Sequence, residues 1–189
     1  MLRLGRPHLA GVDEVGRGCL AGPVVAAAVV LPPAAGGIGI DDSKKLSSGR
    51  RELVFRRLIA SGAAIGIGVV SAAEIDRINI LQASLQAMAK ALAALKLVAD
   101  LVVVDGRQPL PLHLPQYPLV KGDSRCLPVA AASVVAKVVR DRQMVYYDRR
   151  FPVYGFARHK GYATVAHRRA VQCHGPCILH RSSFRFKTP

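Results

Sequence analysis

Short apolar runs alternate along this chain with longer segments in which apolar residues recur at helical spacing. The runs at residues 9–15, 24–31, 63–70 and 101–106 predict strands, because they are rich in Val, Ile and Ala and end in turn-forming residues. Residues 24–31 hold no polar side chain, so both faces of that strand are expected to be buried. Helices are predicted over residues 50–60, 127–147 and 164–173, with a proline-rich loop at 109–118 and at most a short strand at 119–120.

Local signals mark where two of the helices begin. Ser47 or Ser48 can cap the helix at 50–60, and Ser71 with Glu74 forms the Ser-x-x-Glu pattern of a capping box. The clearest helix carries apolar residues at spacings of four and three, at Leu81, Leu85, Met88, Leu92 and Leu95. About two heptads is too short for a coiled coil, so this stripe is expected to pack in the core.

The order of these elements indicates an α/β fold. Strands that alternate with helices favour a three-layer domain with a central sheet. At 189 residues, of which 51% are hydrophobic, the chain is expected to form one domain over 1–189, with 145–189 as a basic C-terminal helical appendage. The apolar run at 24–31 is too short to span a bilayer and lacks the flanks of a signal peptide, so we expect a soluble, cytoplasmic protein. We also expect a monomer, because no apolar stripe is left unexplained.

Charge changes the picture, because it points to a partner. The chain has 27 Lys and Arg against 12 Asp and Glu, a formal net charge of +15. From residue 121 onward there are fourteen basic and three acidic residues, so most of the excess lies in the last third. This asymmetry is typical of a protein that binds a polyanion, and the absence of a basic amphipathic membrane helix favours nucleic acid over lipid.

The cysteines carry a weaker signal. Cys173, His174, Cys177 and His180 lie close together in sequence and could be taken for a zinc site. No second Cys pair completes a standard pattern, however, so small semi-buried thiols are the favoured interpretation of all four cysteines.

The most informative chemistry lies at the end of the first predicted strand, where Asp13 and Glu14 are adjacent. Two neighbouring carboxylates are costly to desolvate unless a cation neutralises them, and Mg²⁺ prefers carboxylate oxygens. Gly16-Arg17-Gly18 follows, with glycines that let a ligand approach the backbone and an arginine suited to phosphate. A solvated acid pair before a glycine turn is the equally weighted alternative for this segment taken alone.

Two more acids stand at element boundaries. Asp105 ends a predicted strand, and Asp123 follows Lys121-Gly122 just before the long helix. Taken singly, each is better explained as an ordinary turn or capping residue. Together with Asp13 and Glu14 they make four carboxylates, which can instead hold two divalent ions about 4 Å apart, an arrangement for phosphodiester hydrolysis.

The motifs as a whole resemble the ribonuclease HII family, the type 2 ribonucleases H. They run in family order over nearly the whole chain: residues 11–18 (GVDEVGRG), 20–29 (LAGPVVAAAV), 42–47 (DSKKLS), 104–106 (VDG), 121–123 (KGD), 130–141 (AAASVVAKVVRD), 154–162 (YGFARHKGY) and 180–184 (HRSSF). Cys19 departs from the proline that is common after the Gly-Arg-Gly motif, at a position that leaves the four acids untouched.

The resemblance implies a ribonuclease H-like fold, with a central mixed sheet flanked by helices and extra C-terminal helices. It implies an endonuclease that cleaves RNA in RNA–DNA hybrids and nicks duplex DNA on the 5′ side of single embedded ribonucleotides, leaving a 3′-hydroxyl and a 5′-phosphate. The family's metal-binding catalytic acids correspond here to Asp13, Glu14, Asp105 and Asp123, with Mg²⁺ or Mn²⁺ as cofactor.

The resemblance also implies substrate contacts. Gly16, Arg17 and Gly18 are expected near the ribonucleotide 2′-hydroxyl, and Tyr162 at the ribose–deoxyribose junction. Among the basic residues, Lys44, Lys45, Lys121 and Arg181 are expected to contact phosphate or support the site, although a solvated basic face explains each one singly.

Two rival interpretations predict different chemistry. One is another nuclease of the same fold, such as a ribonuclease HIII or a resolvase-like enzyme, and the Gly-Arg-Gly motif with Tyr162 argues against it. This chain begins its catalytic strand within about ten residues of Met1, which leaves no room for the N-terminal domain usual in ribonuclease HIII. The other is a basic nucleic-acid-binding protein without catalysis, which gains nothing from acids placed where phosphate must lie.

Overall fold

The computed structural model describes residues 8–33 and 46–184, and it contains a five-stranded mixed sheet in the order β3-β2-β1-β4-β5. β1 pairs antiparallel with β2 and parallel with β4; β2 pairs antiparallel with β3, and β4 pairs parallel with β5. The carboxyl ends of three strands therefore share one edge of the sheet. The strands are β1 (Leu9–Val15), β2 (Val24–Val30), β3 (Ala64–Val70), β4 (Leu101–Asp105) and β5 (Gln116–Leu119).

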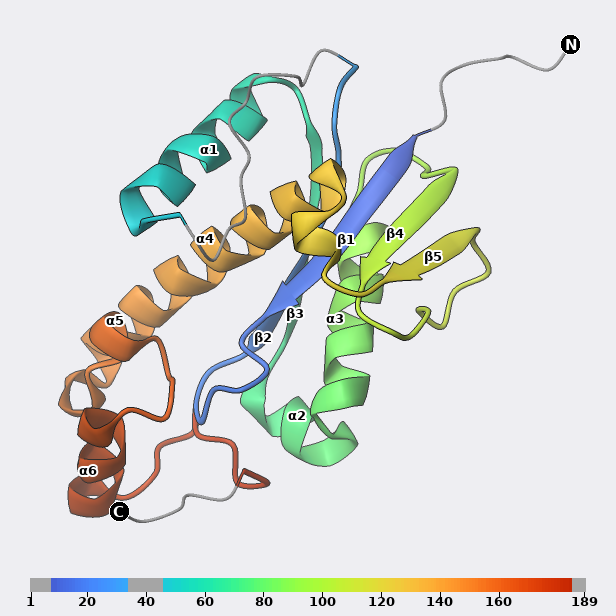
Figure 1. Ribbon diagram of the computed structural model, residues 1–189. Coiled ribbons are helices and arrows are strands. Elements are labelled where there is room, and N and C mark those ends of the chain that lie inside the picture. Colours follow the sequence, from blue (N-terminus) through green and yellow to red (C-terminus); the bar gives the residue numbers. More distant parts are fainter. Residues whose placement is uncertain (1–7, 34–45, 185–189) are drawn as a thin grey trace, which may run out of the picture.

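Helices cover both faces of the sheet, which gives the predicted three layers (Figure 1). α1 and α4 pack on one face, and α2 and α3 lie on the other. The short helices α5 and α6 extend the far end of α4 (Figure 1). The bounds are α1 (Ser48–Ala60), α2 (Ala72–Ile78), α3 (Ile80–Ala93), α4 (Leu127–Arg150), α5 (Phe156–His159) and α6 (Val165–His174), with 3₁₀ turns η1 (Gly122–Ser124) and η2 (Pro152–Tyr154).

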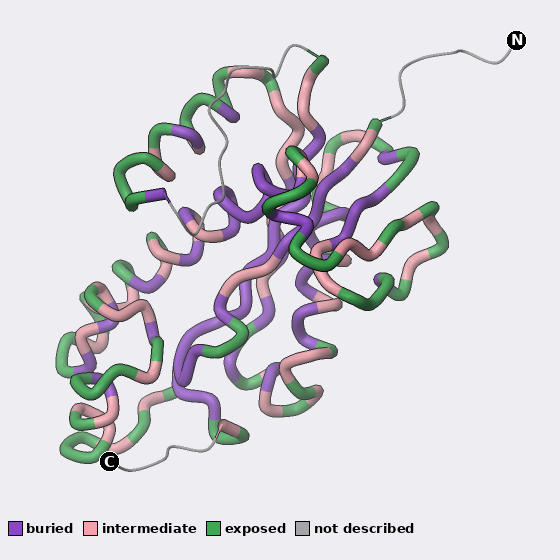
Figure 2. The backbone as a smooth tube through the Cα atoms, viewed as in Figure 1, coloured by how far each residue is buried: buried purple, intermediate pink, exposed green. Residues whose placement is uncertain are grey.

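β2 explains why the core has two halves. All seven of its residues are buried, as its unbroken apolar sequence predicts. Ala26 and Ala28 belong to the cluster under α3, whereas Ala27 and Val29 belong to the cluster under α1 and α4. The alternation of side chains along a strand produces this division. In Figure 2 the buried colour follows the central strands and the inner side of α4.

Glycines set how closely the helices approach the sheet. A Cβ atom on Gly68 would lie 1.9 Å from the Ala87 carbonyl oxygen in α3. A Cβ atom on Gly11 would lie 2.2 Å from the backbone of Pro128 at the start of α4. α4 can therefore begin directly against β1, which brings its first turns beside the strand that carries the acid pair.

The predicted elements are confirmed, with two differences at the start of α3 and in β5. Ser47 caps α1 and Ser71 caps α2, as expected. α3 begins at an unpredicted cap, Asn79, whose side chain accepts the N–H groups of Leu81 and Gln82. β5 includes residues 116–118, which we had predicted as loop; a proline is tolerated there because β5 is an edge strand.

The C-terminal segment forms a third cluster around the end of α4. Met144, Tyr154 and Phe156 are buried there together with Ala21 from the glycine-rich segment. Residue 145, where we expected the appendage to begin, lies inside α4, so one continuous helix contributes to both the sheet core and this cluster. Within the described residues, no helix has the length and apolar character needed to cross a membrane.

Candidate active site

The sheet topology brings three of the four predicted acids together. Asp13 and Glu14 end β1, and Asp105 ends β4, its parallel neighbour. The register pairs Val12 with Val104, so Asp13 and Asp105 occupy equivalent positions on adjacent strands. Functional groups in open α/β sheets commonly lie beyond such carboxyl ends.

These acids open onto a cavity of about 360 Å³. Its lining combines the three carboxylates with cationic and hydroxyl groups, namely Asp13, Glu14, Val15, Arg51, Asp105, Ser133, Lys137 and Tyr162. Acidic groups at the floor and cations at the rim suit a ligand that carries both a bound cation and a phosphate.

Electrostatic strain marks the acid pair. Burial raises the pKa of Asp13 well above its ordinary value, and the neighbouring charges of Glu14 and Asp105 raise it further. Burial also raises the pKa of Glu14, although Arg17 opposes the effect with an ion pair of 3.2 Å. Carboxylates held together against burial and mutual repulsion are typical of a functional site.

Asp123 lies close to this group without lining the cavity. It is 6% exposed and sits in η1, directly after Gly122, whose N–H donates to Asp105 Oδ1 at 2.7 Å. Lys121 precedes it in a left-handed conformation and lines a neighbouring hollow of about 390 Å³ with Arg17 and Asp105. Lys121 and Asp123 therefore lie on either side of Gly122, the residue that hydrogen-bonds Asp105.

Two buried arginines hold the Gly16-Arg17-Gly18 loop from behind. Arg181 is fully buried and donates to the carbonyl oxygens of Gly16 at 2.7 Å, Arg17 at 2.9 Å and Gly22 at 2.8 Å. Arg140, also fully buried, donates to Pro23 and Ala21. With these carbonyls turned inward, Arg17 and Gly18 remain exposed at the surface.

Arg181 was expected to contact phosphate or to support the site, and this geometry excludes the contact with phosphate. Its guanidinium has no exposed surface and is occupied by loop carbonyls, so it supports the glycine motif instead of meeting a ligand. Burial lowers the pKa of Arg181 to about 10, which still leaves it charged at neutral pH. Lys44 and Lys45 fall outside the described residues.

Tyr162 lines the same cavity as the acids, with 41% of its surface exposed. Its hydroxyl hydrogen-bonds the Cys19 thiol, which connects it to the glycine-rich segment. Lys137 Nζ lies 5.7 Å from the centroid of the Tyr162 ring, within range of a cation–π contact.

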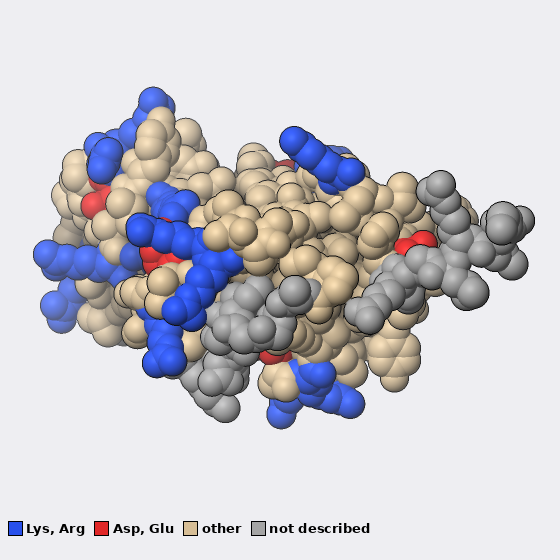
Figure 3. Space-filling view, turned by 90° about the horizontal axis from the view of Figure 1, so that it is seen from above, with Lys and Arg blue, Asp and Glu red and all other residues tan. Residues whose placement is uncertain are grey.

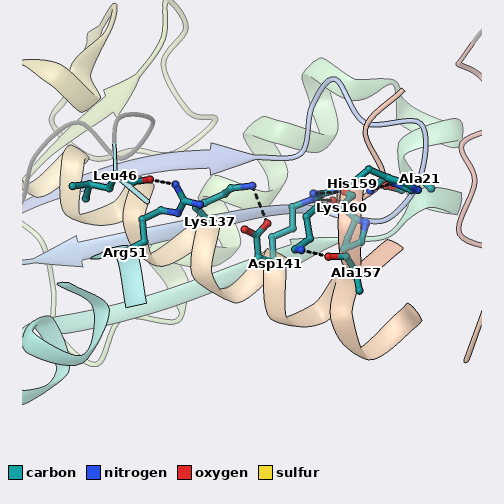
Figure 4. Close-up of polar contacts among 11 residues, drawn as sticks. Ala21, Leu46, Arg51, Lys137, Asp141, Ala157, His159 and Lys160 are labelled. Carbon is teal, nitrogen blue, oxygen red and sulfur yellow. Dashed lines mark hydrogen bonds and ion pairs between the residues drawn. The ribbon is translucent and has the colours of Figure 1, made fainter. Parts of the chain in front are cut away.

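Three cavity residues were not predicted as site residues. Ser133 hydrogen-bonds Asp13, Lys137 forms an ion pair of 2.8 Å with Asp141, and Arg51 donates to the Leu46 carbonyl (Figure 4). Ser133, Lys137 and Asp141 recur every four residues in an otherwise Ala- and Val-rich helix. That polar stripe was the available signal, since residues four apart share a helix face.

Basic side chains are unevenly distributed over the surface. Lys and Arg gather toward the end of the molecule that carries α1 and the C-terminal helices, on the left in Figures 1 and 3. The predicted charge asymmetry is thus also spatial.

The acids fit a divalent metal by their donor chemistry. Glu14 Oε2 is buried without a hydrogen-bond partner, and carboxylate oxygens are the ligands that Mg²⁺ and Mn²⁺ prefer. Their oxygens are otherwise directed to protein donors, since Glu14 Oε1 accepts from Arg17 and Asp13 Oδ1 accepts from the Glu14 N–H. In these orientations, no three Asp, Glu, His or Cys side chains of the described residues form a group that could hold an ion.

Comparison with known proteins agrees with this geometry. The family model described as Ribonuclease HII matches residues 10–187. A ribonuclease HII from Syntrophotalea carbinolica is 57% identical over 183 residues, which covers 97% of this chain and 88% of that protein. Among solved structures, the ribonuclease HII of Archaeoglobus fulgidus, determined in a complex with PCNA, superposes with a TM-score of 0.82 at 26% identity, covering 96% of this chain and 97% of that one. Ribonuclease H2 from Pyrococcus horikoshii superposes with a TM-score of 0.78 at 26% identity and 94% coverage of both chains.

Proposed function

This chain belongs to the ribonuclease HII family, and on that premise we propose that it nicks duplex DNA on the 5′ side of single embedded ribonucleotides. The family establishes a ribonuclease H, a divalent-metal-dependent endoribonuclease that acts on RNA–DNA hybrids. The proposal adds the preferred site of the cut and its products, a 3′-hydroxyl and a 5′-phosphate. One observation carries it: three carboxylates share a cavity with Tyr162, next to the exposed Arg17 and Gly18.

We propose that Asp13, Glu14, Asp105 and Asp123 hold Mg²⁺ or Mn²⁺. The raised pKa of Asp13 and the unpartnered Glu14 Oε2 support this assignment, because a bound cation would offset both costs. When bound, such ions activate a water molecule and stabilise the leaving oxygen of the phosphodiester. Asp123 joins the set through its position beside Gly122, the residue that fixes Asp105.

The remaining residues are proposed to bind and orient the substrate. Ser133 holds the Asp13 carboxylate in place by a hydrogen bond. Lys137 and Arg51 line the cavity and are suited to bind the phosphate next to the cut. Lys121 is suited to bind the nucleic-acid strand where it passes through the neighbouring hollow beside Asp105. Lys44 and Lys45 are retained as proposed phosphate contacts on sequence grounds alone.

Discrimination between RNA and DNA is proposed to depend on the exposed loop and Tyr162. A 2′-hydroxyl both donates and accepts hydrogen bonds, and backbone groups at Gly16, Arg17 and Gly18 can meet it without obstruction by large side chains. The Tyr162 ring offers a flat surface to the next sugar, which lacks that hydroxyl. We propose that the protein acts as a cytoplasmic monomer, with residues 1–189 forming a single catalytic domain.

A gel assay tests the proposal directly. The substrate is duplex DNA with one ribonucleotide, labelled on the strand that contains it, incubated with Mg²⁺, with Mn²⁺ or with EDTA. A metal-dependent nick on the 5′ side of the ribonucleotide is expected. Salt-sensitive binding without cleavage in either metal would reject the proposal and favour a nucleic-acid-binding protein without catalysis.

A further inference from the structure

Three histidines from separate segments meet behind Tyr162. His159 ends α5, His167 lies in the first turn of α6, and His180 pairs with Ala21 in an isolated β-bridge. His167 is fully buried and His180 is 7% exposed. The His159 and His167 rings stack with centroids 4.3 Å apart and planes 16° from parallel. None of the three lines the cavity that holds the carboxylates.

Hydrogen bonds fix which nitrogen of each ring carries a proton. The N–H of Cys177 donates to His180 Nδ1 at 2.9 Å, so the proton of the neutral His180 ring must be on Nε2. His180 Nε2 lies 3.0 Å from His167 Nε2, which must therefore accept. The His167 proton is then on Nδ1, where it points at the Tyr162 carbonyl oxygen 2.9 Å away.

His159 is fixed in the same way. Its Nδ1 accepts the Gly161 N–H at 3.2 Å, so its Nε2 donates to the Tyr154 carbonyl at 2.7 Å. Each ring nitrogen of the neutral cluster thus has an assigned role, and a proton added to His159 or His167 would face a donor. Burial lowers the pKa of all three histidines, that of His167 to about 4, so the rings are neutral at neutral pH.

The chain of hydrogen bonds ends on the backbone of Tyr162. The Tyr162 carbonyl oxygen accepts hydrogen bonds from His167 Nδ1–H and from the Thr164 N–H, the latter at 2.8 Å. The Tyr162 N–H donates to the His159 carbonyl oxygen at 2.9 Å. Gly161, just before it, has φ +84° and accepts the Leu20 N–H at 2.9 Å. The backbone of Tyr162 is therefore held from the histidine side and from the glycine-rich segment.

The contact of Cys177 Sγ with His180 Nδ1, at 3.2 Å, has no nucleophilic role in this arrangement. Burial raises the pKa of the Cys177 thiol, and the ring nitrogen that would act as its base already accepts the Cys177 N–H. The cluster is therefore a structural hydrogen-bond network, which we call the relay, and not a second catalytic pair.

We propose that His167, oriented by His180, is a positioning residue that fixes the Tyr162 ring against the ribonucleotide junction. This inference rests on the proposed role of Tyr162 and extends it: the ring can reject a misplaced sugar only if its backbone cannot move. Loss of the His167 donor frees one side of the 160–164 turn while leaving the carboxylates in place. A displacement of about 1 Å at a positioning group can cost up to about 100-fold in rate.

A double-mutant cycle tests the relay with the full chain in Mg²⁺. The variants are His167→Ala, Tyr162→Ala and the double variant, and kcat and KM are measured on duplex DNA with one ribonucleotide. We expect His167→Ala to lower kcat/KM by about 10- to 100-fold, and by less than about threefold when Tyr162 is already Ala. His167→Asn retains a donor near the Nδ1 position and should recover most of the loss. His174→Asn, at the exposed end of the same helix, is the matched control and should behave as wild type.

The outcomes separate the relay from the proposed function. No nick by the wild type would reject the proposed function and this inference with it. A wild-type rate for Tyr162→Ala would reject the proposed role of Tyr162 and this inference, and would leave the nicking activity standing. A loss for Tyr162→Ala that simply multiplies with the His167→Ala loss would overturn the relay alone. Thermal unfolding of each variant identifies any that is not folded. If His167→Ala is not folded, His167→Phe, which keeps a ring but has no donor, takes its place in the cycle and is compared with His167→Asn in the same way.

A second measurement does not depend on cleavage. The chain contains no Trp, so Tyr162→Trp introduces a single tryptophan at the rim. Its emission anisotropy should fall when His167→Ala is added and stay constant when His174→Asn is added. Equal anisotropy in all three proteins would mean that His167 does not restrain this position.

Discussion

At the scale of single residues, the site is defined by carboxylates whose charged form is disfavoured by burial and by mutual repulsion. Asp13 is nearly buried between Glu14 and Asp105, and its pKa is raised by burial and by both neighbours. Nothing in the packing of β1 requires a carboxylate there, since the residues beside it are Val12 and small side chains of β2. A group that is costly for folding and well placed for chemistry is best explained by its function.

Asp13→Asn should separate catalysis from binding. The amide removes one negative ligand and the repulsion it causes, so cleavage is expected to fall by at least about 100-fold while the free energy of unfolding stays the same or rises. Cleavage rates and urea midpoints, measured on the same preparations, check both parts. Asp100→Asn, an exposed acid that contacts His8, is the matched control and should keep full activity. Near-normal turnover of Asp13→Asn would remove Asp13 from the site.

Arg181→Lys should cost stability despite the conserved charge. The guanidinium donates to three loop carbonyls, and an ammonium on a flexible stem cannot reproduce that fork. Charge-assisted hydrogen bonds contribute about 1.5–3 kcal/mol each, so a loss of at least about 2 kcal/mol is expected in urea unfolding. Arg169→Lys, an exposed arginine of α6, should leave the midpoint unchanged. Unaltered stability of Arg181→Lys would mean that the loop holds itself.

Residue-scale prediction from sequence reached the acids and Tyr162 but not the residues that support them. Asp13, Glu14, Asp105 and Tyr162 stand at element ends, where motif and position agree. For Arg181 both a phosphate contact and a supporting role were open, and only the tertiary packing shows that it is buried and takes the supporting role. Ser133 and Lys137 were missed although their four-residue spacing is visible in the sequence.

At the scale of elements, glycines decide how the layers fit. Gly66 and Gly68 on β3 both face α3, where an added Cβ would lie 2.1 Å from the Ala91 carbonyl oxygen and 1.9 Å from that of Ala87. α3 meets them with small residues, since Ala83, Ala87 and Ala91 are fully buried. The leucine and methionine stripe is confirmed in part, because Met88 and Leu92 are buried in the core and Leu85 and Leu95 pack against it.

Gly68→Ala should therefore destabilise the fold. The methyl group meets backbone and not a flexible side chain, so α3 must move away from the sheet, at a cost of about 1–3 kcal/mol. Urea unfolding measures the change. Gly49→Ala is the matched control, because Gly49 lies in α1 with no atom within 4 Å of the added group, and it should be neutral or slightly stabilising. A neutral Gly68→Ala would show that the interface can relax.

Elements with strong local signals were predicted within a few residues, and those that depend on neighbours were not. The strand at 116–119 is short, contains Pro118 and forms by pairing with β4, a partner fifteen residues away at its start. The cap of α3 uses Asn79 at φ +67°, a conformation that the sequence does not announce. Both features are products of tertiary context, which outweighs local propensity.

The buried histidines should make the free energy of unfolding depend on pH in the acid range. The pKa of His167 is about 4 in the folded protein and near 6.5 when unfolded, so the unfolded state binds the proton first. The contribution of neutral His167 to the free energy of unfolding is therefore complete above about pH 6.5. As the pH falls toward 4 this free energy decreases by up to about 3 kcal/mol. The nearby charges of Asp148 and Lys160 shift the pKa of the neighbouring His159 in opposite directions, Asp148 upward and Lys160 downward. His167→Asn, which cannot titrate, should flatten the fall in urea midpoint over this range; an equally steep fall would place the acid sensitivity elsewhere.

At the scale of the whole molecule, the cavity with the carboxylates adjoins a groove lined by both basic and acidic residues. A hollow of about 300 Å³ between α1 and α4 shares Arg51 with the cavity and is also lined by Arg142 and Lys160. Glu52 and Asp141 lie within it and pair with nearby cations, so its net charge is small and its cations are held in place. We expect this groove to take a nucleic-acid backbone that leaves the cavity, because it lies toward the end of the molecule where Lys and Arg gather in Figure 3.

Binding to duplex substrate should depend steeply on salt and should be oriented by that groove. Each phosphate neutralised by Lys or Arg adds about one to the slope of log affinity against log salt, so six to ten contacts would cost roughly 10³–10⁵ in affinity between 50 and 200 mM salt. Fluorescence anisotropy in EDTA measures this slope without cleavage. Arg142→Gln should lower the slope by about one, because Arg142 is exposed at the groove. Arg77→Gln, an exposed arginine of α2 paired with Glu74 on the other face of the sheet, should leave it unchanged. Equal effects of the two substitutions would mean that the net charge of +15 attracts the duplex without orienting it, and the cavity alone would then have to select the strand that is cut.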